Sequence, residues 1–538
     1  MKAKRILSIL LTLALACGLL AATPTTASAA DIATPMVSAG GAHSLALKSD
    51  GTVYSWGWNA YGQLGIGTYG TADPYRTTPV QVSGLSGVKA VSAGGGFSLA
   101  LKADGTVWAW GTGGGGQLGD GETNGGHYSS TPVRVSGLTN VTAISAGIDH
   151  SLALKSDGTL WAWGENQNGE LGDGTTTTRY TPVQVMTGVI AIAAGHTYSL
   201  ALKSGGAVWA WGSNWSGALA NGTTDSNAHP TPAQVSGVSG ITAVAAGWNQ
   251  VLALKNDGTV WAWGENGSGQ LGIGAVPGYP NNPIPPDYTP VQVPGLSGVS
   301  AVAAGGASLA LKGDGVWAWG PNYHGQCGQG HSDYPQIIML PAQVKGVGGS
   351  GNLTGVTAIT THLGDHCLAL KSDGTVVAWG VNEYGQLGDG TSGTQRLTPV
   401  QVKDVGGTGW LNLKVASTIT TYALTVNGGT GGGSYAVGAT VPIPTLTSQR
   451  RCKRTQPEKS AGSWQQLKVN GQEIVKPTHL KRLYGKPFQA LQKAPKNSNM
   501  RPVMVKIMVR QRTAARNGRT TEEKQKPQSQ SCQDFAAF

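Results

Sequence analysis

One hairpin pattern is repeated along most of this 538-residue chain. The stretch His43–Gly57, HSLALKSDGTVYSWG, returns in near copies at Ser98–Gly111 and Ser151–Gly164. The Trp-Gly pair that ends each copy recurs at intervals of 48 to 60 residues. The seven marks are Trp56, Trp110, Trp163, Trp211, Trp263, Trp319 and Trp379. A repeat of this period indicates units that bury their apolar faces only by packing against one another.

Each unit contains four short runs that favour β-strands. A TPVQV-like run is followed by VxAIxAG, HSLAL and TVWAWG, and in six of the seven units an Asp-Gly turn joins the last two. Asp-Gly between alternating apolar runs is a strong hairpin signal, because Gly accepts the positive φ that the turn needs. The seven TPVQV-like runs begin at Thr78, Thr131, Thr181, Thr231, Thr289, Leu340 and Thr398. No window has a helical apolar period, so we expect an all-β body.

Seven four-stranded units predict a seven-bladed β-propeller over residues 30–410. Small residues such as Ser38–Gly41 suit the crowded axis, and Trp108 and Trp110 can fill the wider gaps between blades farther out. The first unit opens in mid-pattern at Met36, and the seventh stops after Val402. Joined, these ends make one whole blade. We therefore predict that the N- and C-terminal strands pair to close the ring and remove exposed edges.

The N-terminal segment 1–29 has the pattern of a signal peptide. Lys2, Lys4 and Arg5 precede an apolar run, and Ala27–Ala29 fits a cleavage site. We expect a secreted, monomeric protein, with the cell wall as a second location. No other segment is apolar and long enough to predict a membrane span.

Charge is distributed unevenly along the sequence. Residues 30–446 hold 15 basic and 22 acidic residues, whereas residues 447–538 hold 20 Lys or Arg and 5 Asp or Glu. A mildly acidic body argues against nucleic acid as the partner. The basic, glycine-poor segment 447–538 is interpreted as a disordered tail or an out-of-frame sequence, with a polybasic tail for anionic wall polymer as the alternative.

The repeats resemble those of the regulator of chromosome condensation family. The likeness is carried by Val37–Leu47, VSAGGAHSLAL, and Ile144–Leu154, ISAGIDHSLAL. It implies a seven-bladed propeller. Eukaryotic members include a nuclear exchange factor for a small GTPase, and a secreted bacterial member inhibits β-lactamase. In addition, 411–446 resembles the first half of an internalin-type B-repeat, a small β module.

Catalytic signals are weak. His43, His150 and His366 recur at one position of the repeat, which favours a structural role. Cys327 and Cys367 replace core residues of sister repeats, so we expect buried free thiols. The Gly-Asp-Gly-Thr runs at Asp120, Asp173 and Asp389 lack the dense carboxylates of a calcium loop. We predict no enzyme activity, no cofactor and no metal site.

Variable aromatic residues predict a binding face. In an up-and-down blade, the turn after VxAIxAG and the loop after TVWAWG lie on the same face. These segments differ between copies, often by Tyr or Trp, which offer large contact area at low entropy cost. Phe97 and further tyrosines of the longer loops are expected on the same face. The predicted partner-binding residues are Trp58, Tyr61, Trp215, Trp248, Tyr323, His324 and Tyr384.

These observations predict a secreted, non-enzymatic propeller that binds an extracellular or cell-surface protein. The alternative is a module that adheres to carbohydrate or cell-wall polymer through the same face. Guanine-nucleotide exchange, implied by the family's eukaryotic members, is a further alternative that does not suit secretion.

Overall fold

The computed structural model describes residues 33–274, 288–332 and 337–414, together with six short strands between residues 421 and 507. The predicted signal peptide and most of the basic tail lie outside the described residues. Residues up to 417 form one compact unit, and the remaining residues form a second.

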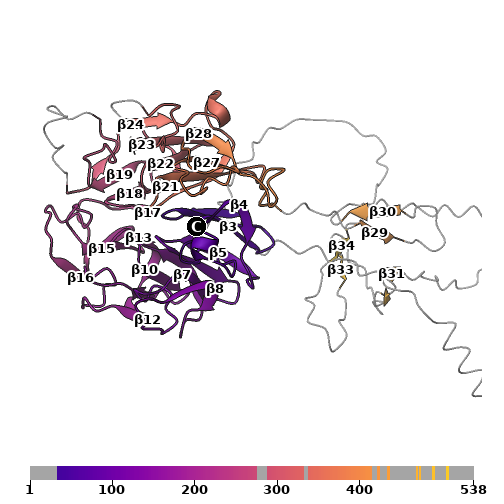
Figure 1. Cartoon of the computed structure of the whole chain (residues 1–538), viewed down its shortest axis with the longest axis horizontal. Helices are drawn as coiled ribbons and strands as arrows, with labels where there is room; N and C mark the ends of the chain where they lie inside the picture. The colour runs from indigo at the N-terminus through magenta and orange to yellow at the C-terminus, as the bar shows by residue number, and fades with distance from the viewer. Residues whose placement is uncertain are drawn as a thin grey trace, which may run out of the picture. The chain divides into compact units, whose positions relative to one another are not determined.

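The first unit is the predicted seven-bladed propeller, built from seven four-stranded antiparallel sheets. The first strands of the sheets contact one another in order around the ring, and the last of them contacts the first. Figure 1 shows the blades following one another from the indigo first blade to the orange seventh, which lie side by side. The all-β, seven-bladed prediction is therefore confirmed.

Each blade is formed by four consecutive strands. The inner strands are β1 (Met36–Ala39), β5 (Val88–Ala93), β9 (Val141–Ala146), β13 (Val189–Ala194), β17 (Ile241–Ala246), β21 (Val299–Ala304) and β25 (Val356–Thr361). The second strands are β2 (His43–Leu47), β6 (Phe97–Lys102), β10 (His150–Lys155), β14 (Tyr198–Lys203), β18 (Gln250–Lys255), β22 (Ser308–Lys312) and β26 (His366–Lys371). The third strands are β3 (Val53–Trp58), β7 (Val107–Thr112), β11 (Leu160–Gly164), β15 (Ala207–Ser213), β19 (Val260–Gly264), β23 (Gly315–Pro321) and β27 (Val376–Gly380). The outer strands are β4 (Tyr75–Gln81), β8 (Tyr128–Arg134), β12 (Arg179–Met186), β16 (Ala228–Gln234), β20 (Val291–Gln292), β24 (Ile337–Gln343) and β28 (Arg396–Gln401).

Two short 3₁₀ turns, η1 (Gly70–Ala72) and η2 (Val347–Gly349), lie in connections of the propeller. Beyond the propeller, three strand pairs are described: β29 (Thr421–Leu424) with β30 (Gly433–Ala436), β31 (Lys468–Val469) with β32 (Gln472–Glu473), and β33 (Phe488–Ala490) with β34 (Val505–Ile507). The β29–β30 pair lies in the segment for which we predicted a β module, and its identity as a B-repeat stays a prediction.

The Trp of each Trp-Gly mark joins neighbouring blades. All seven indoles are fully buried, and each Nε1–H donates to a backbone carbonyl of the preceding blade at 2.8–3.0 Å. In five blades a Ser hydroxyl of the second strand donates to the same carbonyl. Burial of a large aromatic contributes about 2–3 kcal/mol from apolar area alone. The repeated Trp is therefore the main contact that holds each pair of blades together.

The glycine of each mark is required by its backbone. Gly57, for example, has φ of +98°, and a Cβ there would lie 2.6 Å from the carbonyl oxygen of Ala42. The strand register shifts beside this glycine where the third strand pairs with the outer strand. The Trp-Gly pair thus combines an inter-blade contact with a bend that only glycine permits.

The ring closes between the first and seventh blades, but not by a shared sheet. β3 pairs with β4 and β27 pairs with β28, so each terminal blade is complete from consecutive strands. The prediction that N- and C-terminal strands pair in one blade is wrong. A TPVQV-like run pairs with the hairpin before it, whereas we had grouped it with the hairpin after it.

Side chains and a C-terminal extension close the ring instead. Trp56 Nε1 donates to the Gln386 carbonyl at 2.8 Å, as the other six tryptophans do between their own blades. Leu411 and Leu413, which follow the last blade, are buried in one core cluster with Trp56. The Ser49 N–H donates to the Leu413 carbonyl at 2.9 Å.

Candidate functional site

The propeller has two faces with different connections. The loop face, as we name it, carries the turns between first and second strands and the loops between third and outer strands. In six blades the residue after Trp-Gly donates its N–H to a carbonyl of the neighbouring inner turn, as Trp58 does to Ala42 at 2.9 Å. The hairpin face carries the Lys-Ser-Asp-Gly-type turns and the links between blades. The structure thus places the two variable segments on one face, as predicted.

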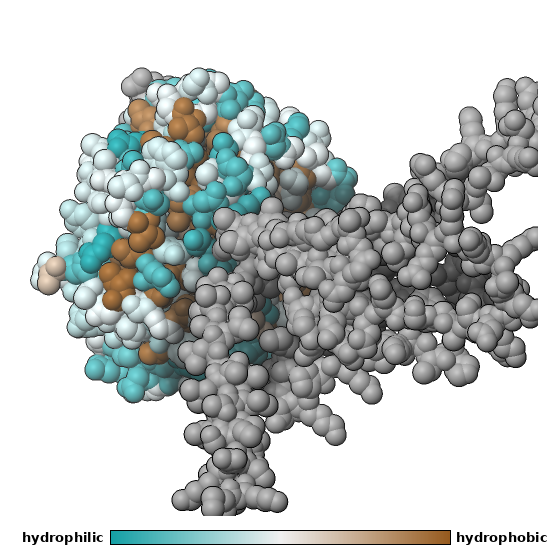
Figure 2. All heavy atoms as spheres, turned by 90° about the vertical axis from the view of Figure 1, so that its right-hand side faces the viewer, coloured by the Kyte–Doolittle hydropathy of each residue, from teal (hydrophilic) through white to brown (hydrophobic). Residues whose placement is uncertain are grey.

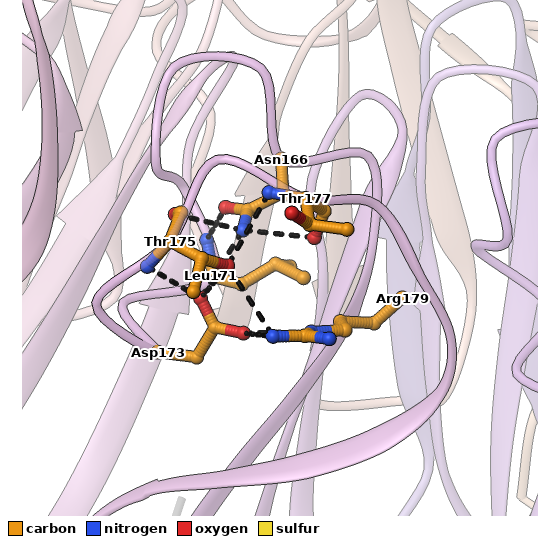
Figure 3. Close-up of polar contacts among 6 residues, drawn as sticks. All are labelled: Asn166, Leu171, Asp173, Thr175, Thr177 and Arg179. Atoms are coloured by element: carbon orange, nitrogen blue, oxygen red, sulfur yellow. Dashed lines mark hydrogen bonds and ion pairs between the residues drawn. The ribbon is translucent and has the colours of Figure 1, made fainter.

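A buried asparagine shapes most of the loops of this face. In blade 3 the Asn166 side chain accepts the Leu171 N–H at 2.9 Å and donates to the carbonyls of Thr175 and Thr177 (Figure 3). Asp173 accepts hydrogen bonds from Thr175 and pairs with Arg179 at 2.6 Å. These bonds lower the pKa of Asp173 although burial acts to raise it. Asp389 pairs with Arg396 in the same way, so both carboxylates stabilise their loops.

The predicted histidines are structural. His43, His150 and His366 are at most 1% exposed, and each Nε2 lies 2.9 Å from a Ser hydroxyl of the next blade. Each of those hydroxyls gives its proton to a carbonyl, so Nε2 carries the hydrogen that fills this contact. Burial lowers the pKa of His43 and His150 to about 3 and that of His366 to about 4. Cys327 and Cys367 are free and buried, as predicted.

Three of the predicted aromatics form one group, which we call the rim cluster. Trp58 contacts Tyr61 edge-on, with ring centroids 5.2 Å apart, and Tyr384 at 5.7 Å. Trp58 and Tyr61 belong to the first blade and Tyr384 to the seventh, so ring closure brings them together. Tyr61 and Tyr384 are exposed, and Trp58 is half-buried between them.

The other predicted aromatics are spread over the loop face. Trp215, on blade 4, is 52% exposed. Tyr323 lies with its hydroxyl 3.4 Å from Ser268 Oγ, and His324 Nδ1 lies 3.2 Å from Gln395 Oε1. Phe97, which we had grouped with the face, is fully buried between blades because it occupies the structural His position. Hydrophobic side chains on the view in Figure 2 form small groups separated by hydrophilic ones.

Trp248 lies near the axis and contacts the seventh blade. Its ring stacks on His196, with centroids 4.6 Å apart, and its Nε1 donates to the Leu363 carbonyl. His362 Nε2 contacts the Ala194 carbonyl of blade 4 at 2.9 Å. The seventh repeat has Thr361-His362 where the other repeats have Ala-Gly, and its turn contacts blades 4 and 5 across the axis. Burial lowers the pKa of both His196 and His362.

The two faces carry opposite charge, which sequence analysis missed because it summed over the whole body. Among the described residues, the loop face holds twelve Asp or Glu against three Arg, a balance of −9. The acids are Asp73, Asp120, Glu122, Asp149, Glu165, Glu170, Asp173, Asp225, Glu265, Asp365, Glu383 and Asp389. The hairpin face holds twelve Lys or Arg against seven Asp, a balance of +5. The one sequence feature that could have predicted this difference in charge is that Lys residues lie in the regular turns and acidic residues in the variable loops.

No group of three or more His, Cys, Asp or Glu in the described residues is arranged to hold a metal ion. Within the same residues no helix is long and apolar enough to cross a membrane.

Comparison with known proteins matches the repeats to two family models. Residues 14–363 match the RCC1-like domain, and residues 373–420 match the regulator of chromosome condensation (RCC1) repeat. The chain is 32% identical over 384 residues to the ultraviolet-B receptor UVR8 of Arabidopsis thaliana, covering 68% of this chain and 69% of that protein. It is 33% identical over 364 residues to the human E3 ubiquitin-protein ligase HERC2, covering 65% of this chain but only 7% of the ligase.

Solved structures show the same fold. Prp20p from Saccharomyces cerevisiae is similar with a TM-score of 0.57 and 23% identity, covering 66% of this chain and 86% of Prp20p. Human WBSCR16 is similar with a TM-score of 0.55 and 24% identity, covering 65% of this chain and 94% of WBSCR16. At these identities the likeness concerns the fold alone.

Proposed function

The chain belongs to the RCC1-like family, and from this premise we propose that it is a secreted, non-enzymatic scaffold whose loop face binds an extracellular or cell-surface protein. Secretion rests on the pattern of residues 1–29. Protein binding as a class is supported by the similar Prp20p, whose structure is described together with its binding to Gsp1p and histones.

The observation that carries the proposal is the position of the aromatic side chains. Trp215, Trp248, Tyr61, Tyr323 and Tyr384 are 37–52% exposed, and all lie on the loop face. Exposed Tyr and Trp are enriched in protein interfaces, where they fill pockets of the partner. The loops of Tyr61, Trp215, Tyr323 and Tyr384 are each held by a buried Asn. These side chains are therefore presented on a rigid base, which lowers the entropy cost of binding.

The charge of the loop face narrows the class of partner. A surface with a balance of −9 repels polyanions and attracts positively charged surfaces. It therefore favours a protein with a basic patch over an anionic wall polymer. Adhesion to neutral carbohydrate is the second candidate, because the adjacent rings of Trp58, Tyr61 and Tyr384 could stack on sugar rings.

Removing the rim cluster tests the proposal. The full chain is immobilised, proteins from its own culture medium are captured, and the captured protein is identified and purified. We expect the triple variant W58A/Y61A/Y384A to weaken its binding about 100-fold, or about 2.8 kcal/mol, because one hot-spot aromatic contributes about 2 kcal/mol or more and its neighbours contribute less. Calorimetry measures the affinity of wild type and variant for the purified partner, and in parallel their affinity for purified wall glycans.

An unchanged affinity of the triple variant for the protein would contradict the proposal. Glycan binding that is lost in the variant, with no protein captured by the wild type, would favour the carbohydrate alternative. Equal unfolding midpoints of variant and wild type serve as the control for folding.

A further inference from the structure

Two carboxylates of blade 3 lie together on the loop face without a cation. Asp149 is in the β9–β10 turn, and Glu165 follows β11; the Glu165 N–H donates to the Asp149 carbonyl at 2.9 Å. Asp149 Oδ1 accepts from Gln117 Nε2 at 2.9 Å, and Glu165 Oε1 accepts from Gln167 Nε2 at 2.7 Å. Both partners are neutral amides, so neither carboxylate charge is balanced.

The three arginines of the loop face do not balance these charges. Arg76, Arg179 and Arg396 each pair with an aspartate of their own loop. Burial and the nearby Glu165 raise the pKa of Asp149 to about 6. A carboxyl group kept in such surroundings is a common feature of functional sites.

A buried acceptor lies beside the two carboxylates. Gln117 is 1% exposed, and its Oε1 has no hydrogen-bond partner. The matching glutamines of blades 1, 5, 6 and 7 use Oε1 to accept the N–H two residues earlier. In blade 2 the amide turns toward Asp149, and its oxygen is left unpaired. An unpaired buried acceptor is costly, which indicates that a donor from outside the chain completes it.

A glycine stands beside this buried acceptor. Gly115 occupies the position at which the other blades carry larger residues: Tyr61, Asn168, Ser216, Ser268, His324 and Tyr384. A Cβ at Gly115 would lie 3.2 Å from Gln117 Oε1 and 3.7 Å from Glu165 Cβ. A side chain at this position would therefore crowd the acceptor and contact Glu165.

We propose that Gln117, Asp149 and Glu165 form a receptor for one arginine side chain of the bound partner, which enters past Gly115. A guanidinium group is planar and carries five donors, so it can bond two carboxylates and an amide oxygen together. The inference rests on the proposed function, since it names the chemistry by which the same face recognises a protein.

Binding of arginine at this site should weaken in acid. The groups that face Asp149 are Glu165 and Gln117, and the adjacent His150 is buried and neutral. Below a pH of about 6 the Asp149 carboxyl holds a proton that the cation must displace. Affinity therefore falls as pH drops from 7 to 5.

The test uses the full chain and the peptide acetyl-Gly-Arg-Gly-amide, titrated by ligand-observed NMR beside its Lys and Gln counterparts. We expect the double variant D149N/E165Q to bind the Arg peptide at least tenfold more weakly than wild type. G115A, which leaves every charge in place, should weaken it at least threefold by filling the entry. E383Q removes an exposed loop-face charge outside the site and should change it less than twofold.

Equal losses in E383Q and D149N/E165Q would overturn the proposal, because they would show only a general attraction to an acidic face. Unchanged binding in D149N/E165Q would overturn it as well. We expect D149N to raise the Tm, because it removes a partly buried charge. A Tm at or above that of wild type shows that loss of binding is not caused by unfolding. Since no partner is present in this assay, its failure is distinct from failure of the proposed function.

Discussion

Replacing Trp263 with alanine is expected to lower the free energy of unfolding by about 4–8 kcal/mol. Trp→Ala in a core costs about 3–5 kcal/mol, and an orphaned buried acceptor adds about 1–3 kcal/mol. The indole of Trp263 is fully buried and donates to the Ala218 carbonyl at 2.9 Å. Val251 occupies the position at which five blades carry Ser. In W263A, therefore, neither an indole nor a serine hydroxyl of blade 5 donates to the Ala218 carbonyl. Urea unfolding followed by circular dichroism measures the change.

A matched pair of variants isolates the hydrogen bond. W211F removes the same bond in blade 4, where the Ser199 hydroxyl still donates to the Glu170 carbonyl at 2.8 Å. W263F should therefore be the less stable of the two by about 1 kcal/mol. A W263A variant that loses less than 2 kcal/mol would show that the Trp contact does not hold the blades together.

The same substitution at the ring joint tests closure. Trp56 donates to Gln386 across the first and seventh blades. In a closed ring this contact is equivalent to the other six, and W56A should cost as much as W211A. In an open array the terminal blades could separate, and W56A would cost far less.

Acid should destabilise the propeller strongly between pH 6.5 and pH 5. The folded-state pKa values of His43, His150 and His366, about 3, 3 and 4, lie below the unfolded value of 6.5. The unfolded chain therefore binds more protons in this range, and stability falls as pH falls. Each histidine contributes a slope of about 1.4 kcal/mol per pH unit, so the three together remove on the order of 5 kcal/mol. That is comparable with the whole stability of many proteins.

The fifth blade provides the control for this prediction. Gln250 occupies the histidine position there, and its Nε2 donates to the Gly305 carbonyl at 2.8 Å. The variant H150Q should reduce the pH slope of stability by about 1.4 kcal/mol per pH unit, because the amide does not titrate. Unfolding midpoints from pH 5 to 8 measure the slope. Identical slopes in wild type and variant would refute the assignment.

Much of the fold could be predicted because the same strand and turn signals recur in seven units. The Trp-Gly marks, the Asp-Gly turns and the small inner residues recur with the same spacing, and the structure gives each its expected place. The membership of the outer strand could not be predicted, because a TPVQV-like run has a hairpin on either side. Only the hydrogen bonds of β4 to β3 and of β28 to β27 decide between them.

The candidate site could be predicted only in part. Variation between copies identified the loop face and the exposed aromatics. It misplaced Phe97, since a variable residue can also fill the gap between blades. The rim cluster depends on ring closure, and the site at Asp149 depends on how one buried glutamine turns its amide. Neither the rim cluster nor this site can be predicted from the local sequence, because both depend on contacts between blades.

The most direct test of the central claim, that the loop face binds a protein partner, compares two tryptophans. Trp215 on the loop face and Trp410 in the extension on the hairpin face are each 52% exposed. The affinity of the purified partner is measured for W215A and W410A in the full chain. We predict that W215A weakens binding at least tenfold and that W410A leaves it unchanged. The reverse order, or equal effects of both, would contradict the account.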